Sequence, residues 1–228
     1  MSKIRAHVER ALQHPVNHVL IQLYRTGADY ISEHSDKTID VVRDSRIVNL
    51  SLGARRTMTL KTKKDACGGG GGDDDDSEQR MPRRTQRVPL PHNSLFVMGL
   101  ETNARWMHSV HTDKRPEGTK EPAERGARIS LTFRRIGTFL TPASAPAQQR
   151  IYGQGATGKT RAEARPVVLG GAQAERLLAA FGAENHQSEF DWDGVYGGGF
   201  DVLHFAAAAA TAPGEPVEGA GEVGSAQT

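Results

Sequence analysis

Short runs in which apolar and polar residues alternate dominate the first 140 residues of the chain. A period of two is typical of β-strands with one buried face, and turn-forming or charged residues separate the runs. Eight strands are predicted: His18–Tyr24, Tyr30–Asp36, Arg46–Leu52, Thr57–Lys61, Arg87–Leu90, Ser94–Leu100, Arg105–Val110 and Ala127–Ile136. Eight short strands indicate a mainly β fold, a jelly roll or barrel.

Helical periodicity occurs on either side of these strands. Ile4, Val8 and Leu12 fall on one helical face, which predicts an amphipathic helix over residues 2–14. A second helix is expected near 172–182. We therefore expect a jelly roll with flanking helices.

Two further segments have compositions that cannot form a packed core. An insertion at 65–84 carries five consecutive glycines followed by four aspartates, and should stay solvated. The Ala/Gly/Glu-rich tail, 206–228, is expected to be disordered. The chain thus divides into a main domain over 1–140, an extension over 141–205 and this tail.

Composition narrows the class of protein. With 228 residues and 37% hydrophobic content, the chain is long enough for one domain with a real core. The formal net charge of +2 comes from 29 basic and 27 acidic residues, so charge alone indicates no partner. The single cysteine, Cys67, cannot form an internal disulfide, and no apolar run approaches the ~18 residues of a membrane span. The start of the chain lacks the apolar region of a secretory signal, so we expect a soluble intracellular protein, nuclear or cytoplasmic.

The pattern His34-x-Asp36 is a candidate metal-binding pair. Residues two apart in a strand project from the same face, so both side chains can bind one cation. His108 can supply a third ligand if its strand lies opposite the first across the mouth of the barrel. Two imidazoles and one carboxylate leave open positions on iron(II), as oxygen activation requires. His111 is a rival ligand, but its strand parity is opposite and an exposed loop position is expected.

The run from Arg128 to Arg134 alternates completely between polar and apolar residues. Its polar face consists of Arg128, Ser130, Thr132 and Arg134. If this face points outward, the run is an ordinary amphipathic strand. If it points into a barrel, two guanidiniums line a pocket. Because the two arginine backbones are about 20 Å apart, the side chains could approach a short dicarboxylate from both ends.

Residues 153–160 fit the phosphate-loop pattern G-x-x-x-x-G-K-T letter for letter. A phosphate loop needs a buried strand before it and a helix after it. Here only two apolar residues precede the pattern, and Pro166 shortens the segment that follows. A nucleotide hydrolase is therefore the less favoured alternative, and Lys159 is expected in a loop outside the barrel.

Several motifs, taken in order, resemble the AlkB-like family of Fe(II)/2-oxoglutarate-dependent dioxygenases over residues 18–140. They are Gln-Leu-Tyr-Arg-Thr-Gly (22–27), His34-x-Asp36, Asn-Leu-Ser-Leu-Gly-Ala (49–54), Leu-Pro-His-Asn-Ser-Leu-Phe-Val-Met (90–98), Trp-Met-His108 and Arg128-Ile-Ser-Leu-Thr-Phe-Arg134. The segment 151–205 resembles the C-terminal extension of fungal AlkB-like proteins. The resemblance implies a double-stranded β-helix, with 1–140 as the dioxygenase domain.

The resemblance also implies the cofactors and their ligands. His34, Asp36 and His108 would hold Fe(II), and O2 would be the oxidant. Arg128 and Arg134 would bind the carboxylates of 2-oxoglutarate, and Tyr24 would donate a hydrogen bond to it. The family usually has asparagine where this chain has Gln22 and Ser130, and both residues can still form hydrogen bonds with the co-substrate.

The expected reaction is oxidative dealkylation of N-alkylated nucleobases in DNA or RNA by a monomer that does not bind membranes. In the family a nucleotide-recognition lid precedes the iron motif. Because His34 lies close to the start of this chain, we expect the lid to be mostly absent and repair of methylated single strands to be poor. The alternative is a degenerate relative that binds nucleic acid or protein without turnover.

Overall fold

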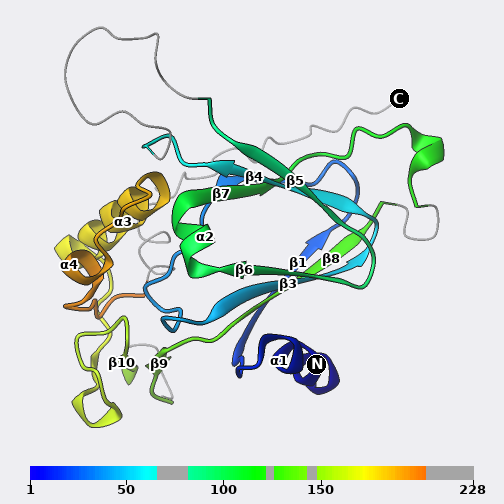
Figure 1. The fold of residues 1–228 in the computed structure, drawn as a ribbon. Coiled ribbons are helices and arrows are strands. Elements are labelled where there is room, and N and C mark those ends of the chain that lie inside the picture. The colour runs from blue at the N-terminus through cyan, green and yellow to red at the C-terminus, as the bar shows by residue number, and fades with distance from the viewer. Residues whose placement is uncertain (66–81, 122–125, 143–147, 204–228) are drawn as a thin grey trace, which may run out of the picture.

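The computed structural model describes residues 1–65, 82–121, 126–142 and 148–203 (Figure 1). The glycine and aspartate runs, Cys67 and the 206–228 tail lie outside these ranges, so the expectations for them stay predictions. In the described part of the chain, no helix is long and apolar enough to cross a membrane.

Two four-stranded antiparallel sheets face each other (Figure 1). The first has the order β1-β8-β3-β6, and the second has the order β2-β7-β4-β5. The bounds are β1 His18–Tyr24, β2 Ile31–His34, β3 Arg46–Gly53, β4 Arg56–Thr62, β5 Thr85–Leu90, β6 Ser94–Gly99, β7 Trp106–Val110 and β8 Arg128–Arg134. Successive strands change sheets except at the β4–β5 hairpin, which is the connectivity of a jelly roll. The eight strands and the mainly β fold are thus confirmed, with ends shifted by at most two residues.

The first sheet carries its apolar face on the outside of the barrel. Helix α1, Ser2–Leu12, packs there, and its Val8 and Leu12 join Leu131 and Phe133 of β8 in one buried cluster. Each such fully buried side chain contributes roughly 1.5–3 kcal/mol of transfer free energy. Because the apolar face of β8 is buried against α1 outside the barrel, the opposite, polar face of the strand can line the interior.

A short helix and an extension complete the fold. Helix α2, Leu100–Arg105, joins β6 to β7, where the sequence predicted two strands separated by residues 101–104 and no helix. After β8 the chain forms a three-stranded sheet, for which no strands were predicted. Its strands are β9 Thr138–Leu140, β10 Arg150–Gly153 and β11 Arg165–Pro166. Helix α3, Gly171–His186, confirms the expected helix and continues four residues further, and α4 is Trp192–Tyr196.

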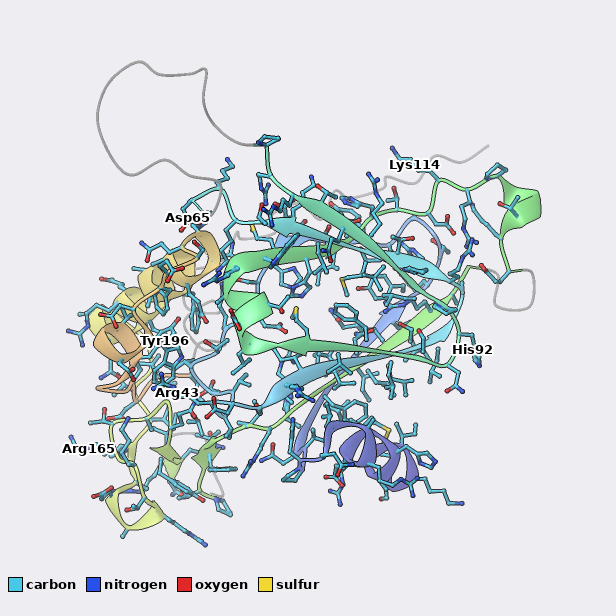
Figure 2. The ribbon with its side chains drawn as sticks, in the orientation of Figure 1. Arg43, Asp65, His92, Lys114, Arg165 and Tyr196 are labelled. Carbon is cyan, nitrogen blue, oxygen red and sulfur yellow. The ribbon has the colours of Figure 1, made fainter. Side chains whose placement is uncertain are left out.

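The helices of the extension have a hydrophobic core of their own. Leu177 and Phe181 of α3 pack with Tyr196 and Phe200. Ile39, from the segment that follows β2, belongs to the same cluster. Figure 2 shows Tyr196 on the side of the barrel where α3 and α4 lie. The extension is therefore joined to the jelly roll through the residues after the His34-x-Asp36 pair.

Candidate active site

The polar face of β8 points into the barrel. Arg128 and Ser130 are each 1% exposed, and both arginines of the strand line a pocket between the two sheets. All eight residues proposed from the sequence line this one pocket: Gln22, Tyr24, His34, Asp36, His108, Arg128, Ser130 and Arg134. Of the two orientations left open for this strand, the structure has the inward one.

The three candidate metal ligands converge in this pocket. His34 at the end of β2 lies directly opposite His108 of β7, with ring centroids 4.3 Å apart. Three ligand atoms, one from each histidine and one from Asp36, all lie within 4.8 Å of one another. The strand of His108 does not lie across the barrel mouth from β2 but is its neighbour in the same sheet, so the two histidines meet side by side. A register shift between Ile31 and His34 brings the two histidines level.

The environment of His108 favours the form that binds metals. The pKa of His108 is lowered to about 4, mainly by burial; His34 and Arg134 also lower it, and Asp36 raises it. The imidazole is therefore neutral near pH 7, with a lone pair available to a metal. Its Nδ1 is buried and has no hydrogen-bond partner in the described part of the chain. A neutral, unpaired imidazole beside a carboxylate fits a divalent cation, so the residues present suit iron(II).

The other end of the pocket suits an anion. The Arg128 guanidinium lies 5.0 Å from the centroid of the Tyr24 ring. Its Nη2 donates to Asn49 Oδ1 at 3.0 Å and to Ser51 Oγ at 2.8 Å. Within the described residues, the buried Nε and Nη1 atoms have no acceptor. Burial lowers the pKa of this arginine, and a buried cation with two free donors calls for a carboxylate.

Two residues that were not predicted as part of the site, Asn49 and Ser51, belong to its polar network. Asn49 lines the pocket and donates from Nδ2 to Ser130 Oγ and, at 3.1 Å, to Thr132 Oγ1. Ser51 Oγ donates to Asn49 Oδ1 at 3.2 Å. The signal was present, because both residues alternate with apolar neighbours in β3, which places them on the polar inner face.

A third such residue, Asn103, supports the candidate metal site from α2. Its Oδ1 accepts from the Asp36 amide at 2.8 Å, and its Nδ2 donates to the Asp36 carbonyl at 2.9 Å. The side chain is 1% exposed. No sequence pattern could have identified it, because its partner is 67 residues away.

The two competing motifs lie elsewhere. His111 is exposed, with Nε2 3.3 Å from Ser109 Oγ, outside the group of converging ligands. Lys159 follows β10 outside the barrel and donates from Nζ to the carbonyls of Gln154, Ala156 and Gly197 at 2.8–3.0 Å. The element directly after it is a three-residue 3-10 helix, Arg161–Glu163. A phosphate loop instead directs its lysine at the nucleotide and opens an α-helix.

The fold and the side chains of the pocket together indicate a class of protein. A jelly roll with two histidines and one carboxylate at a partly open site is typical of non-haem iron oxygenases. The family model of the 2OG-Fe(II) oxygenase superfamily matches residues 1–134, and the chain belongs to this superfamily.

Curated relatives narrow the likeness to the AlkB type. The chain is 32% identical to human DNA oxidative demethylase ALKBH2 over 139 residues, which is 60% of this chain and 46% of the relative. It is 33% identical to the Arabidopsis thaliana protein of the same name over 126 residues, 53% of this chain and 38% of the relative. Human alpha-ketoglutarate-dependent dioxygenase alkB homolog 3 is 29% identical over 143 residues, 63% of this chain and 44% of the relative. The chain spans less than half the length of each of these relatives. It is an AlkB-like member of the superfamily.

Proposed function

We propose that the chain is an Fe(II)/2-oxoglutarate dioxygenase that removes alkyl groups from N-alkylated nucleobases in DNA or RNA. The observation that carries the proposal is the pairing, in one pocket, of three converging metal ligands with a buried arginine that has two free donors. The overall reaction would convert 2-oxoglutarate, O2 and an N-methylated base into succinate, CO2, formaldehyde and the free base. Residues 1–140 would form the catalytic domain, and 141–205 an extension of it.

Each pocket residue has a role in the proposal. His34, Asp36 and His108 would hold iron(II), which supplies the activation of oxygen when bound. Arg128 would bind one carboxylate of 2-oxoglutarate through its free donors, with Tyr24 beside it. Arg134 would bind the other carboxylate of 2-oxoglutarate at the metal end of the pocket, because its guanidinium already contacts Asp36.

Gln22 and Ser130 would provide further polar contacts to the co-substrate. The two residues are directly paired across β1 and β8, and both line the pocket. Their side chains can donate as well as accept hydrogen bonds, so either can meet a carboxylate oxygen.

The nucleic-acid part of the proposal rests on the names of the relatives and on a basic groove. The groove is lined by Arg55, Arg87 and Lys114, whose side chains are exposed and have no ion-pair partner within the described ranges. Figure 2 shows Lys114 on the loop after β7. Free cations along a groove suit a phosphate backbone, because neutralised phosphates release counterions. Localisation in the nucleus or cytoplasm and the monomeric state stay predictions.

The sequence has three clusters of basic residues, and most of their side chains are engaged in other contacts. The clusters are Arg55-Arg56, Lys61-Lys63-Lys64 and Arg83-Arg84. Arg56 is buried and donates to backbone carbonyls, including that of Asp29 at 2.8 Å. Lys63 is buried and donates to the Glu184 carbonyl at 2.5 Å. Lys61 and Arg83 are ion-paired with Glu33. The groove thus depends on cations that the fold brings together from β5 and from two separate loops.

The test is succinate and formaldehyde formation from a methylated single-stranded oligonucleotide in the presence of iron(II), ascorbate and 2-oxoglutarate. We expect formaldehyde and the demethylated base, the latter found by mass spectrometry, in equal amounts, with succinate in excess because repair of methylated single strands is expected to be poor. Succinate without demethylation would retain the dioxygenase and reject the nucleobase substrate. Metal binding without succinate would favour a non-catalytic binding protein.

A further inference from the structure

We propose that the C-terminal extension is part of the metal centre, with Asn185 of α3 as a positioning residue for the segment that carries two of the three ligands. The inference rests on the proposed function, because it concerns the same site. Ser35 stands between His34 and Asp36 and is 1% exposed. Its amide donates to Asn185 Oδ1 at 2.9 Å, and its hydroxyl is 3.3 Å from the same oxygen. One side chain 150 residues away thus holds the residue between the two ligands.

Neighbouring residues of α3 hold the next part of the same segment. The Thr38 amide donates to Glu184 Oε1 at 3.0 Å, and Lys37 Nζ donates to the Phe181 carbonyl at 2.9 Å. Glu184 is itself 5% exposed, and its other oxygen accepts from Tyr196 Oη at 2.8 Å. The last turns of α3 therefore bind the segment at three residues, Ser35, Lys37 and Thr38.

These bonds matter because the segment does not belong to a sheet ladder. After β2 ends at His34, the amides of Ser35, Asp36 and Thr38 are satisfied by the side chains of Asn185, Asn103 and Glu184, respectively. A buried amide left without a partner is costly, so these side chains determine the backbone path. A shift of that path would change where both ligands point.

The helix is rigid enough to act as this support. It is held by the aromatic core of the extension, to which Ile39 contributes from the supported segment. Lys63, at the end of β4, donates from Nζ to the Glu184 and Gln187 carbonyls at the C-terminal end of α3. The helix is thereby attached both to the ligand segment and to the sheet that carries His108. Groups that orient metal ligands typically change metal affinity by about 10- to 100-fold when they are removed.

The experiment measures Mn²⁺ binding by calorimetry, well below the unfolding temperature, in the whole chain and in three variants of α3. Asn185→Ala removes the acceptor, and we expect roughly tenfold weaker Mn²⁺ binding. It should also show faster hydrogen exchange at the Ser35 amide. His186→Ala changes the adjacent exposed residue, whose Nδ1 is hydrogen-bonded within its own helix to the Gly182 carbonyl, and should leave both readouts unchanged. Asn185→Asp keeps an acceptor oxygen and should keep the Ser35 amide protected.

Unchanged Mn²⁺ affinity in Asn185→Ala would overturn the inference, even if that variant unfolds at a lower temperature. Equal loss of affinity in His186→Ala would also overturn it, because the effect would then not depend on the Ser35 contact. A wild-type chain that does not bind Mn²⁺ would instead overturn the proposed function. The two failures are therefore distinguishable.

Discussion

Arg134 Nη2 donates to Asp36 Oδ1 at 2.6 Å, so the last residue of β8 binds a carboxylate that is also a candidate metal ligand. Both side chains are 13% exposed, so water screens the pair only weakly. The contact joins the co-substrate part of the pocket to the metal part. Arg134 can therefore influence the binding of both the metal ion and 2-oxoglutarate.

Arg134→Ala is expected to abolish measurable 2-oxoglutarate binding and to leave Mn²⁺ affinity equal or higher. The co-substrate loses a charged donor, whereas Asp36 loses a competitor for its oxygen. Calorimetric titrations of each ligand separate the two effects. Arg135→Ala, at the exposed neighbour, is the control and should change neither. Unchanged co-substrate affinity in Arg134→Ala would assign the role to another arginine.

Asp36→Ala should reduce Mn²⁺ affinity at least 100-fold, because it removes the only carboxylate among the three converging ligands. His111→Ala should leave the affinity as in the wild type, since His111 lies outside that group. Electron paramagnetic resonance of free Mn²⁺ measures the bound fraction in each variant. Loss of binding in His111→Ala would show that the ligand set is wrong.

Arg128→Met should weaken 2-oxoglutarate binding by roughly 10- to 100-fold, the range for hydrogen bonds to a charged group. We expect little loss of stability without co-substrate, because the variant also removes two buried donors that have no acceptor among the described residues. The readout is the rise in unfolding temperature on adding 2-oxoglutarate, which should largely disappear.

Arg56→Met is the matched control for Arg128→Met, since Arg56 also lies over the Tyr24 ring, at 5.5 Å. Its guanidinium donates to the carbonyls of Thr26, Asp29 and His111, so its loss should lower the unfolding temperature. The temperature rise caused by 2-oxoglutarate should persist. If Arg56→Met lost that response and Arg128→Met kept it, the roles of the two arginines would be exchanged.

Reversing two charges in the basic groove, Arg55→Glu with Arg87→Glu, should weaken binding of single-stranded DNA and reduce its salt dependence. Each lost phosphate contact lowers the slope of log K against log salt by about 0.7 for single strands. Fluorescence anisotropy over a salt series measures this slope. The pair Arg161→Glu and Arg176→Glu, at exposed positions of the extension, changes the net charge equally and should have little effect. Equal effects of the two pairs would mean that net charge, and not the groove, controls binding.

Lys159→Ala should lower the unfolding temperature without affecting any nucleotide binding. The ammonium group connects three backbone carbonyls of the extension, and each such bond contributes about 1 kcal/mol. We expect neither ATP hydrolysis nor a thermal shift with ATP and Mg²⁺ in the wild type. ATP turnover that Lys159→Ala abolishes would revive the phosphate-loop interpretation.

The sequence by itself determined the strands and the local parts of the site. Alternation with a period of two predicted all eight strands of the jelly roll, because a half-buried strand shows its two faces directly in the order of its residues. The same rule put Arg128 and Arg134 on one face of β8, which depends only on neighbours within one strand. It also paired His34 with Asp36, although Asp36 lies two residues beyond the end of β2. Helix α2 and the small sheet of the extension were missed, since each consists of short pieces whose periodicity is too brief to read.

Only the tertiary structure decided which face of each strand is inside and which distant residues meet. The polar face of β8 is internal because α1 covers the apolar face, a choice that the alternation leaves open. His108 lies beside His34 because β2 and β7 are neighbours in one sheet. Asn103 and Asn185 support the ligand segment across 67 and 150 residues of chain. Such contacts carry no local signature, because a buried amide requires an acceptor but does not specify where in the sequence it comes from.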